Sequence, residues 1–171
     1  LSVRPGTRWE LSAQPSYSRS HEAQQYITTR SGGREETFGN RYIFSYIERN
    51  QFSTEFRMSF TVRPDLNLDI YAEPFAASGR YYEYGELLAP GSLDRITYGE
   101  DAGTGLDLQE DGSRVVTVDG QTFTLSNRDF NVRSFNSNVV LRWEWRPGST
   151  LFLVWQQNRD AQETLGSPVG I

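Results

Sequence analysis

The chain has 171 residues, of which 36% are apolar and 13% aromatic, with a mean hydropathy of -0.61 and a net charge of -5. No stretch approaches the roughly 18 apolar residues of a helical membrane span, so a transmembrane helix is excluded. The negative charge argues against a nucleic-acid partner, and the absence of cysteine excludes disulfides and thiolate metal sites. All 17 basic residues are arginine, which codon bias explains more simply than a phosphate-binding surface.

The first third of the chain contains three segments that we predict to be strands, namely Trp9–Ser18, Gln25–Arg30 and Arg41–Glu48. Turn-rich residues separate them, including Ser31-Gly32-Gly33 and Gly39-Asn40. The only histidine, His21, falls in a turn-like stretch. A single histidine cannot build a multi-histidine metal site, and we interpret it as a solvated loop residue rather than a catalytic one.

The next segment, Phe52–Arg63, alternates almost regularly between apolar and polar residues, which predicts an amphipathic strand. The alternation resumes over Leu66–Glu73, so the two strands should form a hairpin. Opposed residues must share a face, and a three-residue loop from Pro64 to Leu66 satisfies that condition. This register places Arg57 opposite Glu73, and we expect the two side chains to pair.

A long connection follows, which we place at residues 76–130 and expect to be an extracellular loop. Its Asp119-Gly120 pair lies between two β-rich runs and predicts a hairpin. The loop is rich in acidic residues, which could bind Ca²⁺, although a solvated acidic surface is the simpler interpretation. Its tyrosines Tyr81, Tyr82 and Tyr84 could stack on sugars or cap the rim of a barrel.

Alternation returns at Ser137–Trp145 and continues over Leu151–Trp155. We predict a type II turn with Pro at its second position and Gly at its third, in a loop from Pro147 to Ser149. About seven main strands result. Strands of about 9 to 11 residues suit a transmembrane β-barrel, whereas soluble strands usually have about five or six. A soluble antiparallel sandwich shows the same alternation and remains the competing interpretation.

Two stretches carry a family resemblance. They are Arg63-Pro64-Asp65-Leu66-Asn67-Leu68 through Tyr71-Ala72-Glu73-Pro74-Phe75, and Arg128-Asp129-Phe130-Asn131-Val132-Arg133 through Asn138-Val139-Val140-Leu141-Arg142-Trp143-Glu144-Trp145-Arg146-Pro147-Gly148-Ser149 and on to Trp155. This region resembles a bacterial family of unknown function whose members join an N-terminal family-nine-like carbohydrate-binding domain to a C-terminal outer-membrane β-barrel.

The resemblance implies that residues 1–171 form a single region of an antiparallel up-and-down transmembrane barrel. The carbohydrate-binding-like domain is not found in this sequence. Family members usually continue to a last strand with an aromatic end, whereas this chain ends in Thr164–Ile171. The expectation is therefore a fragment of a larger, incomplete barrel.

The polar faces of the predicted strands supply the candidate functional residues. If these strands form a barrel, the polar side chains should line its lumen as an array of arginines and acids, while nearby tryptophans form an interfacial girdle. The lumen candidates are Glu55, Arg57, Asp69, Glu73, Arg142 and Glu144, and the girdle candidates are Trp143, Trp145 and Trp155. No residue set predicts a catalytic centre, a metal site or a cofactor.

The sequence thus favours an outer-membrane barrel segment of a Gram-negative-type bacterium, in contact with outer-membrane lipid. Its expected role is non-enzymatic, in the passage or docking of a ligand at the cell surface, with glycan as the candidate ligand. Two alternatives remain open. One is a soluble sandwich that binds carbohydrate, and the other is a barrel-embedded hydrolase that uses a carboxylate pair.

Overall fold

The protein is all-β in the computed structural model, which describes residues 1–163. A seven-stranded sheet has the order β1-β2-β3-β4-β9-β10, with β5 also paired to β4, and a second sheet has the order β6-β7-β8. The only helical element in this range is the 3-10 turn Glu35–Thr37, and no helix there is long and apolar enough to cross a membrane. The strands are β1 (Ser2–Gly6), β2 (Trp9–Ser31), β3 (Asn40–Arg63), β4 (Leu66–Leu87), β5 (Arg95–Thr97), β6 (Thr104–Leu108), β7 (Arg114–Val118), β8 (Gln121–Leu125), β9 (Phe130–Arg146) and β10 (Ser149–Glu163).

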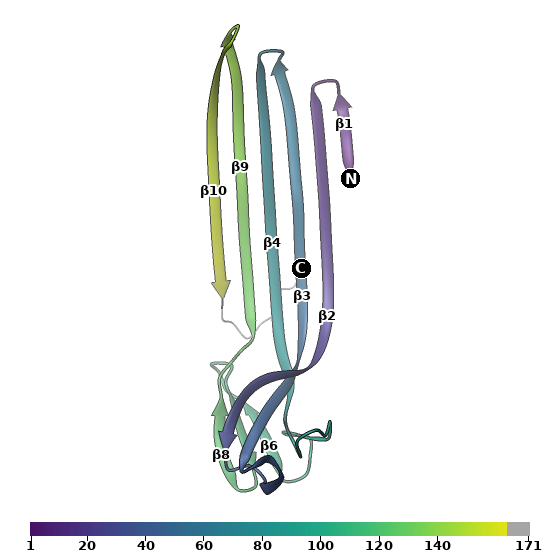
Figure 1. The fold of residues 1–171 in the computed structure, drawn as a ribbon, viewed down its shortest axis with the longest axis vertical. Coiled ribbons are helices and arrows are strands. Elements are labelled where there is room, and N and C mark those ends of the chain that lie inside the picture. Colours follow the sequence, from purple (N-terminus) through teal and green to yellow (C-terminus); the bar gives the residue numbers. More distant parts are fainter. Residues whose placement is uncertain (164–171) are drawn as a thin grey trace. The chain divides into compact units, whose positions relative to one another are not determined.

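The chain divides into two compact units, which we describe separately. Unit 1 comprises Leu1–Ser18, Asn50–Ala77 and Val132–Glu163, and its strands lie side by side in the sheet (Figure 1). Unit 2 comprises, among the described residues, Arg19–Arg49 and Ser78–Asn131. The strands β2, β3 and β4 each contribute one segment to each unit.

The strands are longer than the sequence predicted, because two expected breaks do not occur. The segments Trp9–Ser18 and Gln25–Arg30 belong to the single 23-residue strand β2. Likewise, Arg41–Glu48 and Phe52–Arg63 belong to the 24-residue strand β3. The sequence did not predict these continuous strands, because both faces are polar at the expected breaks. Hydrophobic alternation gives no strand signal where neither face is apolar. The expected loop around His21 is therefore wrong, and the residue lies within β2.

Both tight hairpin turns are shorter by one residue than predicted. Only Pro64 and Asp65 separate β3 from β4, and only Pro147 and Gly148 separate β9 from β10. Gly148 has φ of +78°, the conformation that the third position of a type II turn requires. Figure 1 shows these two turns and the β1–β2 turn at the same end of unit 1.

The long connection begins later than expected, because β4 runs to Leu87 and β9 starts at Phe130. It holds the small sheet β6-β7-β8. The predicted hairpin at Asp119-Gly120 is confirmed, since Val118 pairs with Gln121 and both turn residues have positive φ. Such a conformation is what a two-residue type I′ turn needs. The tail Thr164–Ile171 lies outside the described residues.

Unit 2 contains the hydrophobic core of the described chain. Its cluster of buried residues combines the long strands with the connection: Ile27, Ile43, Tyr84, Tyr98, Val116, Val118 and Leu125. In unit 1, by contrast, Ala77 and Ser137 are the only described residues that are buried. The sheet of unit 1 therefore leaves large apolar side chains exposed.

Candidate functional site

The polar residues predicted on β3 and β4 do share one face of unit 1. Ser59 Oγ donates a hydrogen bond to Asp69 Oδ1 over 2.7 Å, and the Arg57 guanidinium lies over the Tyr71 ring at 5.4 Å from its centroid. Opposed residues of an antiparallel pair lie on one face. These two contacts across the hairpin therefore confirm that its polar positions face the same way.

The predicted ion pair between Arg57 and Glu73 is wrong. Arg57 Nε donates to Glu55 Oε1 on its own strand, while Glu73 Oε2 accepts a hydrogen bond of 3.0 Å from Tyr71. Across the hairpin, Arg57 lies over the Tyr71 ring rather than beside Glu73.

The two remaining lumen candidates lie on β9 and do not join this cluster. Glu144 Oε1 accepts a hydrogen bond of 3.0 Å from the backbone N–H of Gly148, and its own N–H bonds the carbonyl of Asp65 over 2.8 Å. Glu144 thus hydrogen-bonds to both the β9–β10 turn and the β3–β4 turn. Arg142 is exposed and forms no ion pair within the described chain. The six candidates form local polar contacts rather than one convergent site.

The predicted girdle tryptophans on β9 and β10 are all exposed. Trp145 is 51% exposed and Trp155 is 57% exposed, and Trp143 is also exposed. The Arg146 guanidinium lies over the Trp145 ring at 4.7 Å. Sequence reasoning missed Trp9, which stacks on Phe60 with ring centroids 3.9 Å apart. Its position directly after a tight turn was the available signal.

A buried charge network in unit 2 was also missed. Arg41 Nη1 donates to Glu86 Oε1 over 2.6 Å, and its Nη2 donates to Asp119 Oδ2 over 3.0 Å. The side chains of Arg41 and Glu86 are each 2% exposed, and Tyr98 donates a further hydrogen bond of 2.8 Å to Glu86. Burial lowers the pKa of Arg41, but the bonds and charges of the two carboxylates outweigh it and raise the pKa.

A second contact set attaches the connection to β4. Arg114 pairs with Asp129 over 3.1 Å and donates to the carbonyl of Tyr81 over 3.2 Å, and its guanidinium lies over the Tyr84 ring. Burial raises the pKa of Tyr84 to about 12, and its hydroxyl has no hydrogen-bond partner among the described residues. For Tyr98, burial and then the charge of Glu86 raise the pKa. These groups stabilise unit 2 and offer no reactive pair.

The remaining candidates of the loop have structural positions too. Tyr84 is fully buried, and Tyr82 stacks on Tyr46 with ring centroids 5.7 Å apart. His21 is exposed and lies 3.4 Å from the Tyr82 hydroxyl. Within residues 1–163, no group of three acidic or histidine side chains is arranged to hold a metal ion. Asp101 instead accepts a hydrogen bond of 2.7 Å from the Thr97 N–H.

Comparison with known proteins assigns the chain to a family. The model described as a domain of unknown function (DUF5916) matches residues 1–167. The chain belongs to this family. The match extends beyond Arg63–Trp155 and includes the N-terminal strands. No curated protein and no solved structure matches the chain significantly. Membership in the family therefore brings no assigned reaction or ligand.

Proposed function

We propose that unit 1 is part of an outer-membrane β-barrel, with one face on lipid and the polar face on water, in a non-enzymatic protein that passes or docks a ligand. The observation that carries the proposal is the exposure of large apolar side chains on long strands. The exposed set in unit 1 includes Trp9, Tyr17, Phe56, Phe135, Trp143, Trp145, Leu151, Phe152, Leu153, Val154 and Trp155. Water-soluble monomers rarely expose so many large apolar side chains on one sheet.

The lengths of the strands support this proposal. The strands β2 to β4 have 22 to 24 residues, and β9 and β10 have 17 and 15. A tilted transmembrane strand needs about 9 to 11 residues, and soluble strands usually have about five or six. Each long strand is therefore sufficient to cross a bilayer.

The connections also follow the pattern of outer-membrane barrels, in which short turns lie on the periplasmic side and longer loops outside. The turns after β1, β3 and β9 contain two residues each, whereas β4 and β9 are joined through the whole of β5 to β8. The stacked Trp9 and Phe60 lie close to the short turns, as does Trp145. Aromatic side chains at that level would occupy the membrane interface.

Among the described residues, β10 lies at an edge of the sheet, which fits a sheet that other strands complete. β10 ends the strand order, and Leu151–Trp155 expose apolar side chains on both of its faces. Soluble proteins protect such edges with charges or prolines. In lipid, unpaired backbone N–H and C=O groups carry a large cost, so only closed barrels are stable. The proposal therefore requires further strands beside β10.

The soluble sandwich is less well supported. A sandwich needs a second sheet that packs on the apolar face. Within the described part of unit 1, the strands belong to one sheet and bury almost no side chain. The hydrolase alternative also lacks a specific observation, because the carboxylates of the polar face bond to nearby residues and show no convergent pair.

The test compares arginine substitutions on the two faces of β3. Phe56→Arg should lower stability by about 2 to 4 kcal/mol if the residue faces lipid near the bilayer centre. Ser53→Arg, on the polar face, is the matched control and should change stability by less than about 1 kcal/mol. Heat-modifiable gel mobility after reconstitution in lipid measures the folded fraction.

Quenching by brominated phospholipid gives a second measurement, because all four tryptophans belong to unit 1. We expect quenching of the tryptophan emission in reconstituted protein. A monomer that is soluble without detergent, and whose tryptophans are not quenched by lipid, would contradict the proposal. Saturable binding of an oligosaccharide by that soluble monomer would support the sandwich instead.

A further inference from the structure

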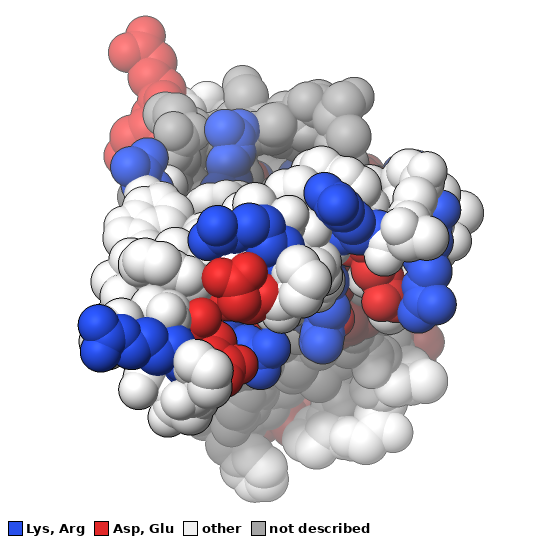
Figure 2. Space-filling view, turned by 90° about the horizontal axis from the view of Figure 1, so that it is seen from above, with Lys and Arg blue, Asp and Glu red and all other residues white. Residues whose placement is uncertain are grey.

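The end of unit 1 that carries the short turns is rich in arginine. Its turns are Thr7-Arg8, Pro64-Asp65 and Pro147-Gly148. Figure 1 places all three at one end, and Figure 2, which views that end, shows more arginine than acidic side chains there. The charged residues within three positions of a turn are Arg4, Arg8, Arg63 and Arg146, with Glu10, Asp65 and Glu144. This end is therefore positive, although the chain has a net charge of -5.

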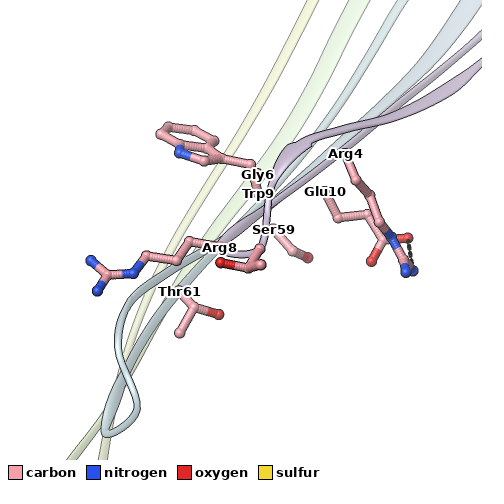
Figure 3. Close-up of a pocket in the computed structure, with 8 residues that line it drawn as sticks. Arg4, Gly6, Arg8, Trp9, Glu10, Ser59 and Thr61 are labelled. Carbon is pink, nitrogen blue, oxygen red and sulfur yellow. Dashed lines mark hydrogen bonds and ion pairs between the residues drawn. The ribbon is translucent and has the colours of Figure 1, made fainter.

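The three carboxylates at this end already have partners. Glu10 is paired with Arg4 over 3.1 Å, as the dashed line in Figure 3 marks. Asp65 Oδ2 lies 3.4 Å from Arg63 Nη2. The third carboxylate, that of Glu144, accepts a hydrogen bond from a backbone N–H of the β9–β10 turn. Two of the four arginines are thus neutralised locally, and the other two are not.

The two remaining arginines each lie beside an exposed tryptophan. Arg8 and Arg146 are exposed and form no ion pair within residues 1–163. The Arg146 guanidinium lies over the Trp145 ring at 4.7 Å. Arg8 directly precedes Trp9, and in Figure 3 both side chains extend to the side away from the Arg4–Glu10 pair. We call Arg8, Trp9, Trp145 and Arg146 the turn rim.

Arginine and tryptophan together suit the level of the lipid headgroups. An indole ring at a membrane interface places its apolar part toward the acyl chains and keeps its N–H near water. An arginine beside it extends its aliphatic stem along apolar surface and holds the charged group at the polar boundary. The groups that meet a guanidinium at this level are lipid phosphates, which accept two parallel hydrogen bonds from it.

We propose that the turn rim binds the phosphate groups of anionic phospholipids. The inference names a lipid class and rests on the proposed function, which places unit 1 in a bilayer. A zwitterionic lipid offers the same phosphate, but its own cation cancels the charge of the headgroup. Each arginine near an anionic surface gains about 1 kcal/mol, which corresponds to about a fivefold preference. The positive rim therefore selects lipids with a net negative charge.

The experiment reconstitutes the full chain in vesicles of phosphatidylcholine with a small fraction of one brominated lipid, either phosphatidylglycerol or phosphatidylcholine. Bromine quenches tryptophan emission on contact, so stronger quenching by the brominated phosphatidylglycerol measures its enrichment around the protein. Trp143→Phe and Trp155→Phe leave Trp9 and Trp145 as the only tryptophans. We expect about a fivefold or larger preference for phosphatidylglycerol at low salt. The preference should disappear in about 1 M salt, where the screening length is about 3 Å.

The double variant Arg8→Gln/Arg146→Gln tests the rim itself. Both substitutions are at exposed positions, and the hydrogen bond of the Arg8 carbonyl is made by the backbone, so we expect the fold to be retained. The preference should fall close to one, while quenching by brominated phosphatidylcholine stays at the level of the parent. The matched control is Arg34→Gln, which removes an exposed arginine without an ion pair from unit 2 and should leave the preference unchanged.

The outcomes separate this inference from the proposed function. Equal quenching by the two brominated lipids would overturn the inference and leave the membrane location supported. A preference that survives in the double variant, or that falls equally in Arg34→Gln, would also overturn it, because the turn rim would then not be the selective surface. Quenching by neither lipid would refute the membrane location, and the lipid partner with it.

Discussion

Removing the guanidinium from the buried network of unit 2 should destabilise that unit strongly. Arg41→Met keeps much of the side-chain volume but leaves Glu86 with Tyr98 as its only partner. Both members of the ion pair are 2% exposed, so the remaining carboxylate has almost no access to water. Loss of one partner from such a pair costs about 3 to 5 kcal/mol.

An exposed pair in the same chain provides the control. Arg4 and Glu10 are joined over a similar distance, but their side chains are 72% and 52% exposed. Solvent screens an exposed pair, and such pairs contribute about 0 to 1 kcal/mol. Arg4→Met should therefore change stability far less than Arg41→Met does.

Hydrogen exchange measured by mass spectrometry can report unit 2 separately from the rest of the chain. The amides of β7 and β8 lie in its core. A loss of 3 kcal/mol corresponds to roughly a hundredfold faster exchange where opening limits the rate. Equal exchange in Arg41→Met and Arg4→Met would refute the reasoning. Arg41→Met combined with Glu86→Leu should recover part of the loss, because no buried charge is then left without a partner.

Three further predictions concern single positions. Tyr84→Phe should be neutral or stabilising at pH 7, because the buried hydroxyl has no partner among the described residues. Since the pKa of Tyr84 is raised from 10.0 to about 12 in the folded state, its contribution is intact below pH 10 and lost as pH rises through 12. The variant should therefore show a shallower alkaline loss in thermal melts followed by circular dichroism, and an unchanged slope would contradict this. Gly85→Ala should destabilise unit 2 by more than about 2 kcal/mol, because the added Cβ would clash with the Ile96 carbonyl oxygen. Gly6→Ala is the control, since its Cβ would meet no atom within 4 Å. Similar melting temperatures for the two variants would refute this prediction. A double-mutant cycle on Glu55 and Arg57 should give a coupling free energy below about 1 kcal/mol, because both side chains are accessible to solvent. A larger coupling would contradict this prediction and would indicate that the polar face of β3 is shielded from water.

Local chemistry explains what the sequence predicted correctly. Asp119 and Gly120 adopt the positive φ values of a two-residue hairpin turn with little strain, so these two residues were sufficient to predict the turn. Alternation over Phe52–Arg63 likewise determined which residues share a face. Both signals act between neighbours in the chain, and neither needs the rest of the fold.

Longer-range features could not be read in the same way. Arg49, Asn50 and Gln51 have no apolar alternation, so the sequence suggested a break where β3 continues without a turn. The sequence also placed Arg57 beside Glu73 across the β3–β4 hairpin, whereas the structure places it over Tyr71. Pairing between strands sets such details, because side chains on both partners must pack at once.

The amino-acid sequence by itself determined the all-β class, the amphipathic faces and the turn that closes β7 and β8. Only the tertiary structure decided that Arg41 meets Glu86 across 45 positions of sequence, and that Trp9 stacks on Phe60. The physical reason is that alternation and turn preference depend on adjacent residues, whereas desolvation and charge pairing depend on which distant segments exclude water together.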